Sequence, residues 1–289
     1  MRNLLPVFIA CMLFFTSFSQ TEQGFVPVQD GKLFYEKKGA GPPIVFLHGI
    51  CLDHRMWQEQ VDFFSDSFTC INLDLRGFGK SSLPTTAYSF HEDLKTFLDS
   101  LKIKEPVIFI ALSMGGKAAI NFSLMYPQKV KSLVLADVAV DGYTFKEFKL
   151  DSIISLAKLT GIDRANQEFL NNPIFTSARG NFSVYSRLKE MILSYSGWQW
   201  THKNPIQTLT PPAIQRLSEI KVPILIVTGE YDIKDFQEIA DILHKSIKSS
   251  VKAQIQNAGH MCNMENPHAF NKVVSDFLHL RQEINFDKQ

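Results

Sequence analysis

The stretch FIALSMGGKAAI, residues 109–120, changes character at its fifth residue. An apolar run typical of a buried strand ends at Ser113, and the paired Gly115 and Gly116 open a run of helix-forming residues. A serine on a tight strand-to-helix turn exposes its hydroxyl above the sheet, provided that small neighbours let the two backbones approach. Ala111 replaces the first glycine of the G-x-S-x-G pattern, and a simple helix N-cap is the competing interpretation. The surrounding pattern favours a nucleophile at Ser113.

Short apolar runs recur along the chain and alternate with amphipathic stretches. Residues 24–39 predict two strands joined by a turn at Asp30-Gly31. The later runs lie at residues 44–47, 70–73, 107–112, 133–135, 224–227 and 251–255. Continuous apolar strands separated by helices are typical of a parallel sheet that is covered on both faces. We therefore expect an α/β fold with a mostly parallel central sheet, and functional residues at the carboxyl ends of its strands.

One long segment interrupts this alternation. Residues 139–212 show no clear strand, are rich in aromatic side chains and end at Pro211-Pro212. Because a connection of this length is rarely a simple loop, we expect a helical cap that is inserted after the sixth strand and lies over the strand ends. The expected division is a core of residues 20–138 and 213–289 around a cap of residues 139–212.

The first nineteen residues form a separate unit. Arg2 precedes an apolar stretch at residues 4–15, and Ser17 and Ser19 follow it. This pattern predicts a signal peptide over residues 1–19 and a periplasmic or secreted protein that begins at Gln20. A stretch of about twelve apolar residues is too short to cross roughly 30 Å of hydrocarbon as a helix, so we expect no stable membrane anchor.

Charge and cysteine content narrow the partners. The chain has 30 basic and 29 acidic residues, whereas a nucleic-acid-binding protein usually has a basic patch, so we expect no nucleic-acid partner. Beyond residue 19 only Cys51, Cys70 and Cys262 occur, an odd number that argues against a disulfide framework. We expect Cys51 and Cys262 to be free thiols near the site. No cluster of cysteine, histidine and carboxylate has metal-ligand spacing, so we expect no metal and no cofactor.

A serine nucleophile needs a base, and the base needs an acid that orients it. His260 lies in NAGHMCNMENP, directly after the last apolar run, and is the best candidate for the base. Asp232 follows the preceding run in VTGEYDIKDF, while Asp235 is explained as a helix-capping residue. Asp137, at the end of LVLAD, is a competing acid, and position favours Asp232.

An oxyanion hole requires two backbone N–H groups aimed at one oxygen. Met114, next to the nucleophile, would supply one of them. Ile50 would supply the other from the stretch FLHGI, where Gly49 permits a close backbone approach and His48 braces the loop. Gly115 is the small residue that the turn requires.

Five motifs in this order resemble the α/β-hydrolase superfamily, in particular its lid-bearing esterase, enol-lactonase and haloperoxidase-like branch. They are FLHG, DLRGFGKS, ALSMGG, VPILIVTGEYD and NAGHMCNMENP. The resemblance implies a catalytic triad of Ser113, Asp232 and His260, with the Ile50 and Met114 amides as the oxyanion hole. It also implies a hydrolase that cleaves a small carboxylic ester or lactone through an acyl-enzyme, and the aromatic residues of the expected cap indicate an apolar substrate.

Three alternatives remain within this resemblance. The same triad can support carbon–carbon bond hydrolysis or cofactor-free perhydrolysis, and a receptor-like member of the fold would bind a ligand without turnover. An intact triad counts against the receptor, and a serine nucleophile disfavours the aspartate-dependent dehalogenases and epoxide hydrolases. In the cap, Trp198 and Trp200 are candidate substrate contacts, although aromatic residues also build cores.

Overall fold

The computed structural model describes residues 21–286 of the chain. The predicted signal peptide, residues 1–19, and its cleavage site before Gln20 lie outside these residues. Within the described part, no helix has the length and apolar character needed to cross a membrane.

The centre of the fold is a sheet whose strands are mostly parallel, as the sequence predicts. In the described residues it has eight strands in the order β1-β2-β4-β3-β5-β6-β7-β8, and only the pairings of β2 with β1 and with β4 are antiparallel. The strands β3, β5 and β7 are buried along their whole length, which explains their continuous apolar sequences. Their bounds are β1 (Glu22–Val28), β2 (Gly31–Lys38), β3 (Pro43–Leu47), β4 (Thr69–Leu73), β5 (Val107–Leu112), β6 (Val130–Ala136), β7 (Ile224–Gly229) and β8 (Ser250–Ile255).

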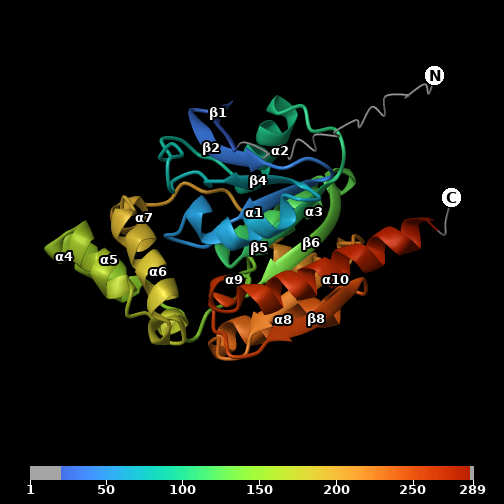
Figure 1. The fold of residues 1–289 in the computed structure, drawn as a ribbon. Coiled ribbons are helices and arrows are strands. Elements are labelled where there is room, and N and C mark those ends of the chain that lie inside the picture. The colour runs from blue at the N-terminus through green and yellow to red at the C-terminus, as the bar shows by residue number, and fades with distance from the viewer. Residues whose placement is uncertain (1–20, 287–289) are drawn as a thin grey trace, which may run out of the picture.

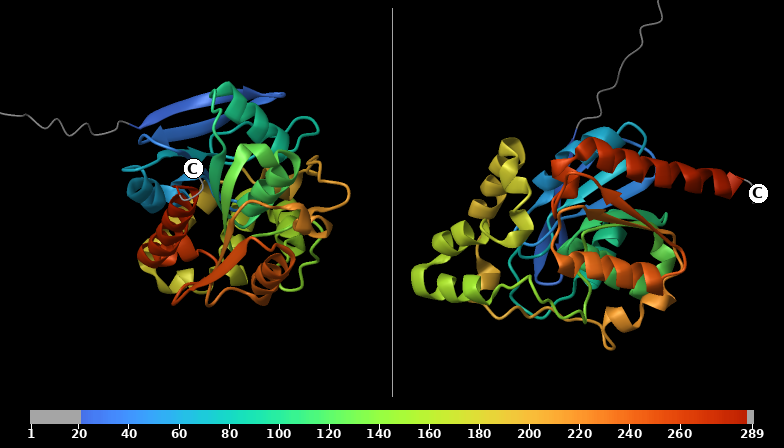
Figure 2. Two further views of the ribbon diagram at one scale, coloured as in Figure 1. Left: turned by 90° about the vertical axis from the view of Figure 1, so that its right-hand side faces the viewer. Right: turned by 90° about the horizontal axis from the view of Figure 1, so that it is seen from below.

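Helices cover both faces of this sheet. The left view of Figure 2 shows α10 on one side of the sheet and α2 and α3 on the other. The longest of them, α10, begins at Pro267, and the Asn266 side chain caps it by accepting a hydrogen bond from the N–H of Ala269 at 3.2 Å. The bounds of the core helices are α1 (Gln58–Phe64), α2 (Phe90–Ser100), α3 (Met114–Met125), α8 (Lys234–Ser246), α9 (Cys262–Glu265) and α10 (Pro267–Phe286).

The chain between β6 and β7 forms the predicted helical insert, which we call the cap. Figure 1 and the right view of Figure 2 show its four α-helices standing together at one side of the core. Where the insert leaves and rejoins the core, the N–H of Ile214 donates a hydrogen bond to the Asp141 carbonyl at 3.0 Å. The cap helices are α4 (Asp151–Thr160), α5 (Ile162–Phe169), α6 (Phe182–Ser194) and α7 (Trp198–Thr201).

Candidate active site

Ser113 occupies the turn between β5 and α3, where the sequence predicts the nucleophile. Its backbone has φ 52° and ψ −116°, a conformation that is strained for any residue except glycine. The turn is held by the N–H of Ser113, which donates to the Ala136 carbonyl at 3.1 Å. A Cβ atom on Gly115 would lie 2.3 Å from the Leu47 carbonyl oxygen, so the helix can approach β3 this closely only with glycine at that position.

Asp232 and His260 form a buried hydrogen-bonded pair. The Nδ1 atom of His260 lies 2.8 Å from Oδ2 of Asp232, and both side chains are at most 2 % exposed. Their loops follow β7 and β8 and are joined by the N–H of Tyr231, which donates to the Ala258 carbonyl at 2.9 Å. Because the carboxylate accepts the Nδ1 proton, Nε2 is left as the basic nitrogen, the tautomer that a general base needs.

Asp137, the competing acid, lies beside this pair. Its carboxyl oxygens are within 4.8 Å of the ligand atoms of Asp232 and His260, and they accept the N–H of Gly229 at 3.0 and 3.2 Å. Burial and then the neighbouring Asp232 carboxylate raise the pKa of Asp137 well above its ordinary value. The Nδ1–H of His260 donates its hydrogen bond to Asp232, the acid that position favours, and not to Asp137.

Asp235 has a different role from the predicted one. The helix α8 begins with Ile233 as its N-cap, and no side chain caps it. The Asp235 carboxylate instead accepts the backbone N–H groups of Lys146, Glu147 and Phe148 at 2.7 to 3.1 Å. Burial opposes ionisation, but these donors outweigh it and lower the pKa of Asp235. The residue therefore fixes the segment that leads into the cap, a long-range contact that helix-capping patterns do not reveal.

The loop after β3 lies against the serine turn. A Cβ atom on Gly49 would be 3.0 Å from Cδ2 of Leu112 and 3.5 Å from Cβ of Ser113, so the loop passes directly beside the nucleophile. His48 is fully buried, and its Nε2 accepts the N–H of Leu75 at 2.9 Å while Nδ1 lies 2.8 Å from the Gly49 carbonyl oxygen. Burial lowers the pKa of His48, so a neutral imidazole braces this loop.

A cavity of about 330 Å³ opens at the serine turn. Its wall includes Ile50, Ser113 and Met114. Across residues 21–286, no hydrogen bond uses the backbone N–H of Ile50 or Met114. Phe236 lines the same cavity, and its ring centroid lies 4.2 Å from that of His260. Around these residues the wall is mainly apolar, through Phe90, Tyr143, Phe145, Phe148 and Ile206 among others. Its polar side chains are Lys117, Asp141, Gln199 and Asn204.

The two predicted tryptophans do not line this cavity. Trp200 is 1 % exposed within the cap, and its Nε1 donates to Oδ1 of Asn166 at 2.8 Å. Trp198 is stacked on His202. Successive residues of a helix point about 100° apart, and in α7 it is Gln199, between the two rings, that faces the cavity. Its Nε2 is buried without a hydrogen-bond partner in the described part of the chain, and no sequence pattern singled it out.

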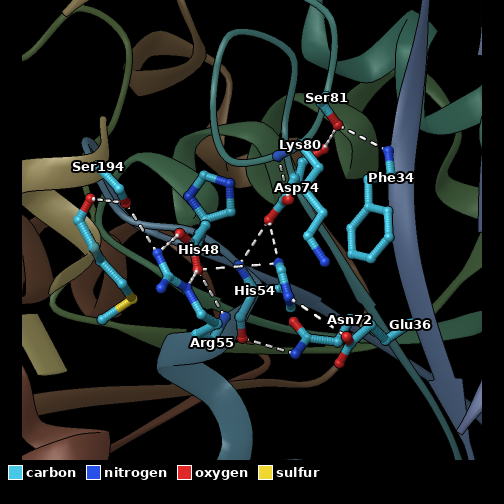
Figure 3. A network of polar contacts seen from close by, with 12 residues as sticks. Phe34, Glu36, His48, His54, Arg55, Asn72, Asp74, Lys80, Ser81 and Ser194 are labelled. Atoms are coloured by element: carbon cyan, nitrogen blue, oxygen red, sulfur yellow. Dashed lines mark hydrogen bonds and ion pairs between the residues drawn. The ribbon is translucent and has the colours of Figure 1, made fainter. Parts of the chain in front are cut away.

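A second buried polar group, the His54–Asp74 cluster, joins the segment after β3 to the segment after β4 (Figure 3). We define it as Asp53, His54 and Asp74. Oδ1 of Asp74 lies 2.8 Å from both the backbone N and Nδ1 of His54, and its Oδ2 accepts the N–H of Lys80 at 2.8 Å. The cluster borders another cavity of about 320 Å³, which the cap partly walls through Met191, Ser194 and Tyr195. The sequence did not indicate this cluster.

Two groups of side chains in the described residues bring possible metal ligands together. One is the His54–Asp74 cluster, and the other is Asp137, Asp232 and His260. The histidine and one aspartate of each group already bond to each other, so we propose no metal at either place. The three cysteines of the described residues, Cys51, Cys70 and Cys262, are free thiols and are buried. Burial and then the neighbouring Asp137 carboxyl group raise the pKa of the Cys262 thiol.

Comparison with known proteins identifies the family. Residues 42–267 match the family described as the alpha/beta hydrolase fold, so the chain belongs to that family. It is 30 % identical over 277 residues to a Bacillus subtilis (strain 168) protein provisionally named as a 2-succinyl-6-hydroxy-2,4-cyclohexadiene-1-carboxylate synthase, with 88 % of this chain and 97 % of that protein covered.

Two further relatives carry hydrolase names. The carboxylesterase YbfK of Bacillus subtilis (strain 168) is 27 % identical, with 90 % of this chain and 88 % of the relative covered, and its crystal structure superposes with a TM-score of 0.73. The 3-oxoadipate enol-lactonase 2 of Acinetobacter baylyi is 24 % identical, with 85 % and 92 % covered. The protein is a carboxylesterase-like α/β-hydrolase enzyme.

Proposed function

We propose that the protein cleaves a carboxylic ester or lactone through an acyl-enzyme on Ser113. The observation that carries this proposal is that Ser113, in its strained turn, shares one cavity wall with Ile50 and Met114, whose backbone N–H groups are free to bind an oxyanion. The names of the carboxylesterase and enol-lactonase relatives support the same reaction class.

In this mechanism Oγ of Ser113 attacks the carbonyl carbon while Nε2 of His260 takes the hydroxyl proton. Asp232 holds the ring and stabilises its positive charge through the Nδ1 hydrogen bond. The N–H groups of Ile50 and Met114 bind the oxygen that becomes negative. His260 then protonates the departing alcohol oxygen. In the second half, His260 deprotonates a water that attacks the acyl carbon, and the acid leaves as Ser113 regains its proton.

The cavity indicates the substrate class. About 330 Å³ is at the small end of ligand sites, and apolar side chains, five of them aromatic, make up most of the wall, so we propose a small substrate with an apolar group beside the reacting carbonyl. Gln199 and Asn204 add side-chain amides to this wall, so we propose that the substrate also carries a polar group.

An active-site-directed fluorophosphonate tests the proposal directly. It should label the peptide that contains Ser113 in the wild-type protein and in Ser123→Ala, a control that removes another serine of α3 whose hydroxyl only bonds to Ile120. Ser113→Ala should lose both labelling and turnover of an ester and lactone panel.

The outcomes separate the alternatives. Undiminished ester turnover by Ser113→Ala would contradict the mechanism. Labelling of Ser113 without turnover of any ester or lactone would instead favour carbon–carbon bond cleavage, perhydrolysis or ligand binding on the same fold.

We further propose that the protein is exported to the periplasm or the medium. The support is the sequence pattern of Arg2, the apolar stretch at residues 4–15, Ser17 and Ser19. Intact-mass measurement of exported material should give a chain that begins at Gln20. Retention of residues 1–19 would contradict the proposal.

A further inference from the structure

Two carboxyl groups meet beneath the catalytic histidine. Asp137 follows β6 and Asp232 follows β7, and because these strands are neighbours in the sheet, their two side chains reach the same place. The ligand atoms of Asp137, Asp232 and His260 all lie within 4.8 Å of one another. Asp137 is 1 % exposed, and the Asp232 side chain is fully buried.

The groups around this pair do not neutralise two negative charges. Asp232 accepts the N–H of Ile233 at 2.7 Å and bonds to His260. Asp137 accepts the N–H of Gly229 and bonds to the Cys262 thiol. Within residues 21–279, no lysine or arginine pairs with either carboxyl group, and Glu265, which acts on the Cys262 thiol, brings a negative charge and not a positive one.

Two carboxylates at this separation in a buried site repel each other strongly, so one of them holds a proton. Asp232 already accepts hydrogen bonds from two N–H donors. Burial and the Asp232 charge both raise the pKa of Asp137. The proton therefore belongs on Asp137, where it can form a hydrogen bond to Asp232.

We propose that Asp137 is a positioning residue that stays protonated and donates its O–H to Asp232, so that one negative charge, held by three donors, faces His260. The three donors are the N–H of Ile233, Nδ1–H of His260 and the carboxyl of Asp137. This inference rests on the triad of the proposed function. Its consequence is that His260 faces one negative charge and not two.

The pH dependence of kcat/KM distinguishes the two charge states. Asp137→Asn keeps a neutral donor, so the midpoint of the acidic limb of the kcat/KM profile should move by less than about 0.3 pH unit. The loss of a neighbouring charge would move it farther. If Asp137 is ionised in the wild-type protein, the same substitution removes a negative charge beside the imidazole and should shift the limb downward by roughly one unit or more. That shift would overturn the proposal.

A second variant tests the donor itself. Asp137→Leu removes the hydrogen bond to Asp232, and we expect kcat to fall by about tenfold or more while KM changes by less than about twofold, as for the loss of other groups that orient a catalytic side chain. An equal kcat in Asp137→Leu and Asp137→Asn would contradict a role in positioning Asp232.

Infrared spectroscopy tests the proton without any turnover. At pH 7 the wild-type protein should show the carbonyl stretch of a protonated carboxylic acid that is missing from Asp137→Asn and retained in Asp99→Asn, a control whose exposed carboxylate pairs with Lys95 and Lys129. Absence of this band from the wild-type protein would overturn the proposal without any variant. Because this measurement needs no substrate, its result is independent of whether the proposed ester or lactone reaction is correct.

Discussion

The molecule contains two buried histidine–aspartate pairs with the same contact distance. His260 and Asp232 are 2.8 Å apart, and so are His54 and Asp74. They differ in what faces the second ring nitrogen. Nε2 of His54 lies 3.5 Å from the Glu36 carboxylate, whereas in the described residues Nε2 of His260 has no hydrogen-bond partner and its ring packs on a residue of the Ser113 cavity.

This difference separates a structural pair from a catalytic one. Burial lowers the pKa of His54, but Asp74, Asp53 and Glu36 together raise it above its ordinary value, so these carboxylates favour the protonated form of the ring. In that form the ring has no free nitrogen to accept a proton from a serine. A short histidine–aspartate contact is therefore insufficient evidence for catalysis, and the second nitrogen decides.

The largest expected effect comes from removing each histidine in turn. His260→Ala should lower kcat/KM by about 10⁴-fold or more, and combining it with Ser113→Ala should add little because the groups act as a unit. His54→Ala should keep turnover within about tenfold in the folded protein but lower the free energy of unfolding by roughly 3–5 kcal/mol, since it leaves buried Asp74 unpaired. Steady-state kinetics measures the loss of turnover, and chemical denaturation measures the loss of unfolding free energy. Equal losses of turnover would remove the distinction between the pairs.

Substitutions of Asp232 and Asp74 should differ in the same way as those of their histidine partners, with a smaller difference in turnover. Asp232→Asn should reduce kcat by about 10⁴-fold, because the imidazole loses its tautomer and charge stabilisation. Asp74→Asn should act mainly on stability, because Asp74 holds the backbones of His54 and Lys80. The control is Asp99→Asn on the surface. A stable Asp74→Asn variant that is as inactive as Asp232→Asn would contradict this assignment.

The His54 pair should also appear in the pH dependence of stability. The pKa of His54 is higher in the folded protein than in the unfolded chain. The contribution of His54 to the free energy of unfolding is therefore fully present below about pH 6.5 and is lost as pH rises through the pKa of the folded protein. We expect the difference in unfolding free energy between the wild-type protein and His54→Gln to be larger at about pH 6 than at about pH 9. Denaturant titrations at both values test this, and a constant or widening difference would show that the ring is neutral.

The smallest effect is expected at Glu36. This carboxylate lies farther from His54 than Asp74 does and is half-buried, so Glu36→Gln should cost only about 0.5–1 kcal/mol of stability and leave kcat/KM within about twofold. It should also reduce the pH effect described for His54. Thermal unfolding at two pH values is sufficient, and a loss of activity would mean that the cluster communicates with the active site.

The sequence predicted the features that backbone pattern controls. Apolar runs located the parallel strands, and because parallel strands end at one edge, the loops carrying Ser113, Asp232 and His260 could be assigned to one site. The structure brings Asp232 and His260 into contact and puts Ser113 on a strained turn.

Side-chain directions and long-range contacts were not predictable in this way. Asp235 has the spacing of a helix cap, yet it binds backbone of residues 146–148, which come from far along the chain. In α7 the pattern suggested that Trp198 and Trp200 contact the substrate, while the rotation of the helix presents Gln199. Asp74 opens the motif DLRGFGKS, which does not reveal its pairing with His54, twenty residues away.

The joined stems of the cap have a consequence for how this enzyme could be altered. The insert leaves and rejoins the core where Ile214 bonds to Asp141, and Gly142, with φ 96°, packs against Pro212 there. Since β6 and β7 pair directly without help from the insert, the sheet and the loops that carry Asp137 and Asp232 are complete on either side of this junction. These stems therefore mark where a segment of different length or sequence could be grafted, and such variants would share one reaction centre and differ in the side chains that line its cavity.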